Sequence, residues 1–428
     1  MGLCLILRER ARSSGIDRVW DVKGGLMADM RSTEPGDREE PLSRTDWVLL
    51  PLIAVSTVIG IACATQWLAG RLFTESSTTT FPCLIVDDPS TGVRAIPRSH
   101  CSEKIYESAL VSYSFNSCGH RAGFECGPKP PDTYRIVMVG SSFNLGMRVP
   151  RAESFAALLP KELSRRTGRN VELYNEAMQW GFPRSVDLRI AQAIPESPDM
   201  IFWPLTPEDI EEVDYLLPPD PLRRGSSRGL AQIWAKVRAK SPPEMVRAAW
   251  TWISSQLDQT RSVFMLKHFL FMSQSQFIRQ TLASGASGGY LRVPMDSEWT
   301  NNLDSFERHY EDVQMRAQEI GAVVVVTLLP ARVQAAMISI NDRTPGSDPY
   351  LLDRMLRTVV TRHGGRFVDI LPDFRNVRDA GQMYFPVDGH PDTRWHALVA
   401  KMLSKALLVG EIPHLREIHG TAKMNASR

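Results

Sequence analysis

The sequence predicts an α/β fold in which a parallel β-sheet lies between layers of helices, preceded by one membrane-spanning helix. Between residues 131 and 410, short apolar runs alternate with amphipathic stretches, the order typical of a parallel sheet covered by helices. A stretch of different character, residues 214–300, interrupts this order and predicts a helical insertion. Near the N-terminus, the run from Trp47 to Thr65 carries no charge and predicts a helix that crosses a bilayer.

The overall composition is that of a globular protein. Of the 428 residues, 43% are hydrophobic and 23% are charged, which excludes a disordered chain or a polytopic membrane protein as the main content. The length predicts two or three structural units. Lysine and arginine number 50 against 48 acidic residues, and no basic stretch alternates with aromatic residues, so nucleic-acid binding is not expected.

The predicted membrane-spanning helix covers residues 47–70. About 20 apolar residues cross the hydrocarbon core, and Trp47 and Trp67 stand where interfacial aromatic residues are common. Arginine is more frequent just before this helix than just after it. Because positively charged flanks stay inside, we expect residues 1–46 to form a cytoplasmic tail and the chain beyond residue 72 to lie outside the cytoplasm.

Two alternatives to a permanent anchor stay open. Ala62, Cys63 and Ala64 form the small-x-small pattern of a signal-peptidase site, although the apolar run before them is long for a cleaved signal. Cys63 could instead accept a lipid, but the residues before it lack the leucine usual at such sites. Met27 is an alternative start, which would make residues 1–26 a mis-set beginning of the chain.

Four cysteines lie close together after the membrane segment, at positions 83, 101, 118 and 126. Their spacing is not that of a metal-binding CxxC motif, so disulfides are favoured over a metal site. Three pairings are possible, and the sequence does not choose among them. Residues 74–130, rich in Ser, Thr, Pro and Cys, are interpreted as a disulfide-containing lead-in segment with short strands.

The α/β pattern itself contains five apolar strands and four clear helices. The strands are expected at residues 134–140, 171–175, 199–203, 321–329 and 366–370. The helices are expected at residues 153–166, 185–193, 350–363 and 393–408. Ligands of such folds gather at the carboxyl ends of the strands. A polar tail, residues 411–428, follows the last helix.

Inside the insertion, residues 230–240, 244–257 and 262–282 have helical patterns, and residues 263–272 are unusually apolar. The favoured interpretation is a helical cap packed on the sheet, since amphipathic stripes usually belong to a core. The alternative is a helix lying in the membrane plane or a lid that binds an acyl chain. His268 lies within this run and is interpreted as a packing residue.

A candidate nucleophile follows the first strand, where Gly140, Ser141 and Ser142 form a predicted strand-to-helix turn. Such a turn can expose a serine hydroxyl next to backbone N–H groups that stabilise an oxyanion. A phosphate-binding loop is excluded, because no lysine follows in the required order. Ser142 could also serve only to cap the next helix.

A candidate base stands near the far end of the chain, just before the last helix. Asp388 lies two residues before His390, and a carboxylate so placed can fix the tautomer and orientation of a histidine that activates a serine. The two residues could instead only hold a tight turn at Gly389 and Pro391. His396, at the start of the last helix, is interpreted as structural.

Together these motifs resemble the SGNH (GDSL-type) hydrolase family over about residues 112–408, apart from the insertion. The blocks that carry the resemblance are Asn116 to Arg121, Gly140 to Phe143, Gly146 to Val149, Glu153-Ser154, and Asp388 to Asp392 followed by Trp395-His396. The resemblance implies a flavodoxin-like three-layer α/β/α fold. It also implies Ser142 as nucleophile, His390 as base and Asp388 as the acid that orients the base, with no cofactor or metal.

The chain departs from the family pattern in the blocks that supply the oxyanion hole. The family's glycine donor should correspond to Ala177 or Gly181, and the family's asparagine donor is matched by Glu208. A carboxylate cannot donate a hydrogen bond unless it is protonated. Asn144 and Asn175 are therefore the alternative side-chain donors.

These observations predict a membrane-anchored extracytoplasmic serine esterase. By analogy with related polysaccharide acetylation proteins, its expected substrates are acyl esters, O-acetyl groups among them, on envelope glycans. One alternative is a non-catalytic envelope binding or scaffold protein that kept the fold, for which Glu208 is the strongest argument. Another is an O-acyltransferase that uses the same serine to acylate a polysaccharide.

Overall fold

The structure is a computed structural model that describes residues 43, 45–73, 83–86, 92–216, 260–284, 288–410 and 412–416. Nearly all of the predicted cytoplasmic tail lies outside the described residues, as do the predicted helices 230–240 and 244–257. Most of the polar tail lies outside them too.

The predicted membrane segment forms one continuous helix, α1 (Asp46–Leu72). Its large apolar side chains are exposed, including Trp47 and Trp67 near its two ends. The helix is long and apolar enough to span a membrane. Considered by itself, α1 therefore has the length and the surface of a membrane-spanning helix.

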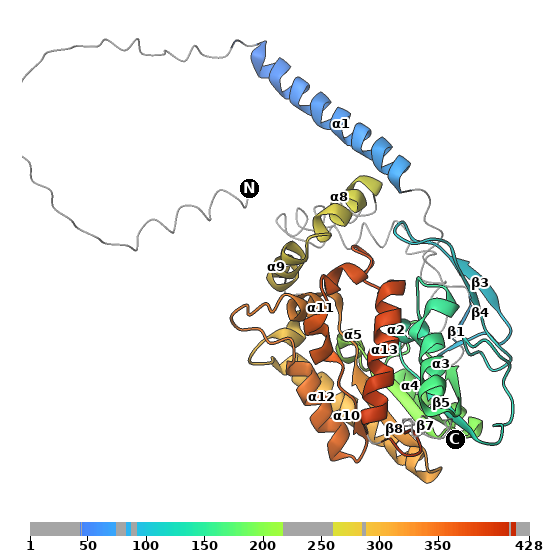
Figure 1. Cartoon of the computed structure of the whole chain (residues 1–428). Helices are drawn as coiled ribbons and strands as arrows, with labels where there is room; N and C mark the ends of the chain where they lie inside the picture. The colour runs from blue at the N-terminus through green and yellow to red at the C-terminus, as the bar shows by residue number, and fades with distance from the viewer. Residues whose placement is uncertain are drawn as a thin grey trace, which may run out of the picture. The chain divides into compact units, whose positions relative to one another are not determined.

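The central sheet contains five strands, all parallel, in the order β6-β5-β7-β8-β9. Their bounds are β5 (Thr133–Met138), β6 (Asn170–Asn175), β7 (Met200–Leu205), β8 (Val323–Leu328) and β9 (Arg366–Phe367). Counted along the chain, this is the order 2-1-3-4-5 of flavodoxin-like folds. The predicted three-layer α/β/α fold is confirmed (Figure 1).

The strands form on runs rich in apolar and β-branched residues, although Arg135 lies within β5 and Glu172 within β6. Every residue of β5 and β7 is buried, which is typical of strands covered by helices on both faces. The last strand is shorter than the predicted 366–370. After Phe367 the chain turns into the 3-10 helix η5 (Leu371–Asn376), and the Asp369 carboxylate accepts a hydrogen bond from the Leu371 N–H at 3.1 Å.

Helices flank the sheet in two packed pairs, α3 with α13 and α4 with α10. Trp203 of β7 contacts Phe306 of α10, whereas Trp395 of α13 contacts Phe155 of α3. The bounds are α2 (Ser142–Leu145), α3 (Phe155–Thr167), α4 (Pro183–Ala193), α5 (Pro207–Glu211), α10 (Ser297–Glu319), α11 (Arg332–Ser339), α12 (Leu351–Arg362) and α13 (Thr393–Val409). The short 3-10 helices are η1 (Arg151–Glu153), η2 (Ile194–Glu196), η4 (Gly289–Leu291) and η6 (Ala380–Met383). Helix α10 and helix α11 were not among the predicted elements.

The described part of the insertion contains two helices, α8 (Arg261–Phe271) and α9 (Gln274–Ser284), where the sequence predicts one at 262–282. The Arg332 guanidinium donates to the Phe271 carbonyl oxygen at the end of α8. At the start of α9, the Gln274 side chain accepts the Gly381 N–H at 2.8 Å. These contacts hold the break between the helices against α11 and η6.

The lead-in segment contains two antiparallel pairs, β1 (Leu84–Val86) with β2 (Val93–Ala95) and β3 (His100–Glu103) with β4 (Val111–Ser114). Disulfides join Cys83 to Cys101 and Cys118 to Cys126, which selects one of the three possible pairings. The segment has a small apolar core, and that core includes residues of the α/β domain. It contains Val93, Val111, Tyr113 and Phe115 together with Leu145, Met147, Ala177 and Met178. The lead-in is therefore packed onto the α/β domain.

Candidate active site

The serine at the end of the first sheet strand is presented by a tight strand-to-helix turn. Gly140 has a φ of +130°, and a Cβ at this position would lie 1.9 Å from the Asn144 side-chain nitrogen, so only glycine fits. Ser142 is the first residue of α2 and is half-buried. Its N–H therefore has no acceptor within the helix.

The three residues predicted to form a triad lie together. The His390 Nε2 is 2.9 Å from the Ser142 Oγ, and the His390 Nδ1 is 2.7 Å from the Asp388 Oδ1. The side chains of His390 and Asp388 are 18% and 17% exposed, so both are in partial contact with solvent. This chain of contacts suits a general base that removes the serine proton.

A short loop before α13 carries the acid and the base. Gly389 adopts a left-handed conformation with a φ of +84°, and its N–H donates to the Phe385 carbonyl oxygen at 2.9 Å. The Phe385 N–H in turn donates to the His390 carbonyl oxygen at 2.9 Å. Asp392 caps α13 by accepting the Arg394 and Trp395 N–H groups. The loop is thus fixed at both ends, which orients the imidazole.

Arg148 pairs with the acid of the triad. Its Nε and Nη2 lie 3.3 Å from the Asp388 Oδ2, and its Nη1 contacts the Glu103 carboxylate of β3. Burial alone would raise the pKa of Asp388, but the charges of His390 and Arg148 reverse this effect and hold that pKa well below its usual value. Asp388 is therefore a stable carboxylate partner for His390.

Glu107, also from the lead-in, holds the backbone of the same loop. Its carboxylate accepts the Val387 N–H at 3.0 Å and the Asp388 N–H at 3.0 Å, and it lies 2.7 Å from the His268 Nδ1. The Glu107 side chain is only 1% exposed. The sequence analysis did not single out Glu103, Glu107 or Arg148.

The two asparagines proposed as oxyanion donors are engaged in holding the turn. The Asn144 Nδ2 donates to the Val139 carbonyl oxygen at 3.2 Å and to the Pro204 carbonyl oxygen at 2.6 Å. The Asn175 Nδ2 donates to the Asn144 carbonyl oxygen at 3.0 Å. These bonds tie the ends of β5, β6 and β7 together.

The other three oxyanion candidates are also accounted for by contacts or exposure. The Ala177 N–H donates to the Asn175 Oδ1 at 3.2 Å, and the Gly181 N–H donates to the Met178 carbonyl oxygen at 2.9 Å. A Cβ at Gly181 would lie 2.3 Å from the Gly140 carbonyl oxygen, so this glycine permits a close backbone approach. Glu208 is exposed.

The carboxylate that points inward at this position is Asp209, not Glu208. Asp209 forms a capping box with Thr206 at the start of α5, and its Oδ2 accepts the Thr206 N–H at 2.6 Å. Burial raises the pKa of Asp209 to about 7, although hydrogen bonds from Ser141 and Thr206 oppose the rise. Asp209 thus lies beside the residue that precedes the nucleophile.

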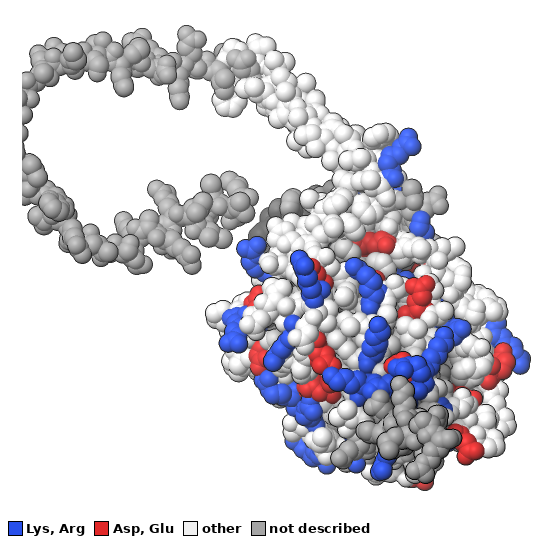
Figure 2. Space-filling view, viewed as in Figure 1, with Lys and Arg blue, Asp and Glu red and all other residues white. Residues whose placement is uncertain are grey.

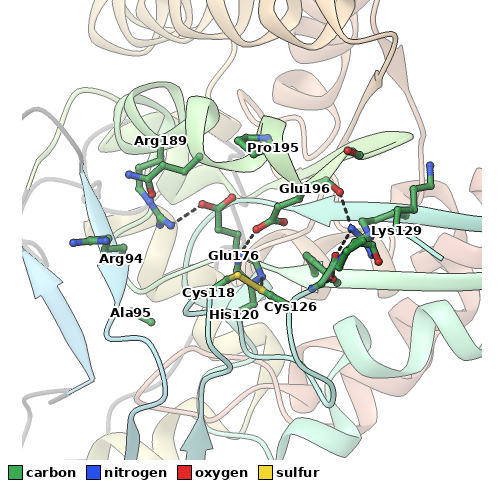
Figure 3. A pocket seen from close by; sticks show the side chains of 16 residues that line it. Arg94, Ala95, Cys118, His120, Cys126, Lys129, Glu176, Arg189, Pro195 and Glu196 are labelled. Carbon is green, nitrogen blue, oxygen red and sulfur yellow. Dashed lines mark hydrogen bonds and ion pairs between the residues drawn. A yellow bond between two sulfur atoms is a disulfide. The ribbon is translucent and has the colours of Figure 1, made fainter.

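A polar cavity of about 530 Å³ lies away from the triad (Figure 3). It is lined by the Cys118–Cys126 disulfide and by charged side chains that pair with one another. Arg189 bonds Glu176 at 2.7 Å, and His120 contacts Glu196 at 3.0 Å. The first pair joins α4 to the residue after β6, and the second joins the lead-in to η2. None of Ser142, Asp388 and His390 lines the cavity.

Comparison with known proteins finds similarity in fold only. No protein-family model and no curated protein matches the chain. Among solved structures, the chain is similar to TesA, with 12% identity, a TM-score of 0.35, and coverage of 64% of this chain and 98% of that chain. It is also similar to a variant of Axe2, an acetyl-xylooligosaccharide esterase from Geobacillus Stearmophilus, with 10% identity and a TM-score of 0.34. That alignment covers 66% of this chain and 96% of the Axe2 chain.

A third similar structure is that of a putative lipolytic protein of the G-D-S-L family from Desulfitobacterium hafniense DCB-2. It has 11% identity and a TM-score of 0.32, and the alignment covers 64% of this chain and 99% of that one. These proteins include members of the group that the sequence resembles. The α/β/α layering predicted from the sequence stands on the strand order of the sheet itself.

Proposed function

We propose that the protein is a serine esterase of the SGNH type. The observation that carries the proposal is the continuous contact from Asp388 through His390 to Ser142, which joins residues 248 positions apart in the sequence. The left-handed turns at Gly140 and Gly389 aim the two ends of this contact at each other. A residue that only capped α2 would not need a histidine and a buried carboxylate in line with its hydroxyl.

In the proposed reaction, His390 removes the Ser142 proton as the serine oxygen attacks an ester carbonyl. Asp388 stabilises the imidazolium, and Arg148 keeps Asp388 ionised. His390 then gives the proton to the leaving alcohol, and water attacks the acyl-enzyme by the same route in reverse. The products are an alcohol and a carboxylic acid.

The oxyanion is proposed to bind the Ser142 N–H first, because that group has no acceptor within α2. The second donor is the Ala177 N–H, whose bond to Asn175 is 3.2 Å long and has to be exchanged for the oxyanion. Gly181, Asn144 and Asn175 remain candidates of lower rank, because their donors hold shorter bonds that support the turn.

The proposed location is the outer face of a membrane, with α1 as a single-pass anchor and the N-terminus in the cytoplasm. The apolar surface of α1 supports the anchor, and the two disulfides support an oxidising compartment. Acyl esters of envelope glycans, O-acetyl groups among them, are the substrates proposed for this location. An O-acyltransferase to polysaccharide is the second candidate, because the same acyl-enzyme could be resolved by a sugar hydroxyl.

The test is active-site labelling of the full chain with a fluorophosphonate, together with hydrolysis of p-nitrophenyl acetate. Both are expected in the wild type and absent in Ser142→Ala. Labelling that is absent in the wild type would favour the non-catalytic scaffold, and labelling that is unchanged in the variant would rule out Ser142 as the nucleophile. If a glycan acceptor is added and acylated glycan is the only product, the transferase is favoured over the esterase.

A further inference from the structure

Helix α8 has two faces of different character. Phe264 and His268, one turn apart, lie on the face that packs against the domain. Leu266, Phe269 and Leu270 lie on the opposite face and are 65%, 55% and 37% exposed. Large apolar side chains grouped in this way on a helix mark a contact surface.

The inner face of α8 touches the residue that follows the membrane helix. The Phe73 ring lies 5.2 Å from the Phe264 ring and 5.1 Å from the His268 ring, and Phe73 is 8% exposed. Phe73 comes directly after Leu72, the last residue of α1. Phe73, the residue directly after α1, is therefore packed against α8.

The composition of α8 suits a membrane surface. The helix contains two basic residues, Arg261 and Lys267, and no acidic residue. In Figure 2 the surface around α8 is mostly uncharged, whereas Lys, Arg, Asp and Glu are interspersed over the rest of that face. Helices that combine an apolar face with basic residues lie in the membrane plane with the apolar face among the acyl chains.

Two buried contacts connect α8 to the catalytic loop. The His268 Nδ1 contacts the Glu107 carboxylate, which accepts the N–H groups of Val387 and Asp388. Arg332 donates both to the Phe271 carbonyl oxygen at the end of α8 and to the Pro386 carbonyl oxygen, the latter at 2.5 Å. A contact surface on α8 thus lies next to the loop that carries the acid and the base.

We propose that the Leu266, Phe269 and Leu270 face of α8 lies in the surface of the membrane that α1 spans, and that the active site takes an acyl ester borne by that membrane. The substrate class is an amphiphilic acyl ester, with its apolar part held in the bilayer and its ester at the surface. The substrate class rests on the proposed esterase function, whereas the membrane contact of α8 does not.

The first test reads the environment of α8 directly in the full chain, reconstituted in vesicles of phosphatidylglycerol and phosphatidylethanolamine. An environment-sensitive fluorophore is attached at Phe269→Cys in a chain that carries Cys4→Ala and Cys63→Ala. The matched control is Val409→Cys, a 74% exposed apolar position at the end of α13. We expect blue-shifted emission at position 269 that lipids spin-labelled near the headgroup quench, and water-like, unquenched emission at position 409.

Emission at position 269 equal to that at position 409 would overturn the proposal. Blue-shifted emission that the spin-labelled lipids do not quench would also overturn it, because a second protein copy would then cover the face.

The second test compares two substrates in the same vesicles, water-soluble p-nitrophenyl acetate and bilayer-dissolved p-nitrophenyl palmitate. In the double variant Leu266→Glu, Phe269→Glu, we expect kcat/KM for the palmitate to fall about 10-fold while the acetate rate stays unchanged. Val409→Glu is the control and should change neither rate. An equal fall for both esters, or no fall for the palmitate, would contradict the substrate class.

The failure of this proposal and that of the proposed function are distinguishable. If the wild type hydrolyses neither ester, the esterase function fails, while the fluorescence at position 269 still decides whether α8 contacts the membrane. If the acetate is hydrolysed but the fluorophore at position 269 has water-like emission, the esterase function is supported and the membrane contact is contradicted.

Discussion

The two sides of Ser142 are built differently. On the side of the base, His390, Asp388, Arg148 and Glu103 form a continuous series of charged contacts that is complete without a substrate. On the opposite side, the donors of Asn144, Asn175 and Ala177 are already bonded to the protein. Under the proposed function, activation of Ser142 is preorganised, whereas stabilisation of the oxyanion requires an exchange of partners. Mutations on the two sides should therefore have different effects.

The largest effect is expected on the side of the base. Asp388→Asn should lower kcat/KM for p-nitrophenyl acetate by about 10⁴-fold, because the amide favours the wrong tautomer of His390. Ser142→Ala should be at least as inactive. Circular dichroism and thermal melting check that both variants fold. Activity within 10-fold of the wild type in either variant would contradict the assigned roles.

Arg148 should have the next largest effect. Arg148→Met leaves the carboxylates of Asp388 and Glu103 buried without their shared partner, so kcat/KM should fall roughly 10- to 100-fold. The pKa of Asp388 should rise, because Arg148 is one of the charges that lower it. The acid limb of the rate profile should move to higher pH, because Arg148 no longer repels the proton that inactivates His390 as a base.

Arg148→Lys is the conservative control for this prediction. It keeps the charge but cannot contact both carboxylates as a planar guanidinium does, so it should restore the pH profile more fully than the rate. If Arg148→Met lowers the rate without moving the pH profile, Arg148 acts only through packing.

On the oxyanion side, Asn175 is expected to affect stability more than rate. Asn175→Ala removes the bond to the Asn144 carbonyl oxygen and the acceptor for the Ala177 N–H, so unfolding should become about 1–3 kcal/mol easier. Denaturant titration measures this change, and kcat should fall less than in Arg148→Met. A loss of ~100- to 1000-fold in kcat at unchanged stability would instead identify Asn175 as an oxyanion donor.

The last prediction concerns the pH dependence of stability and involves no change in rate. The pKa of Asp209 is about 7 in the folded chain and about 3.9 when unfolded, so the folded state loses stability as pH rises between these values. Asp209→Asn should remove this loss. Its stability relative to the wild type should therefore improve from pH 4 to pH 8 by on the order of 2–4 kcal/mol. Glu208→Gln, at the neighbouring exposed position, is the control and should show no such trend.

The sheet and the triad contacts were predictable from the sequence because their signals are local. Runs rich in apolar residues mark β5 to β8, and Ser142 and His390 each stand within two residues of a turn-forming glycine. The buried position of the Asp209 carboxylate was also predictable from the sequence. Thr206 and Asp209 have the spacing of a capping box, a signal that favours Asp209 over Glu208 as the buried residue.

The residues that support the triad were not predictable in the same way. Arg148 meets Asp388 across 240 positions of sequence, and Glu107 meets the same loop across 280. Such pairs are created by tertiary packing and leave no periodic or spacing pattern in the sequence. Helix α10 is a different case. Its buried Trp299, Leu303, Phe306 and Tyr310 have helical spacing, so this helix could be predicted from the sequence.

Under the proposed function, the disulfide between Cys83 and Cys101 would link the lead-in to the timing of activity. Glu103 lies two residues after Cys101 on β3, and its carboxylate pairs with the Arg148 nitrogen that does not contact Asp388. In a reducing compartment the chain would possess Ser142, His390 and Asp388 but would lack the bond that fastens β3 to β1. We therefore expect the enzyme to become active only after export, when the disulfide forms and holds Glu103 against Arg148. Before export, the reduced chain would be inactive and would not hydrolyse esters in the cytoplasm.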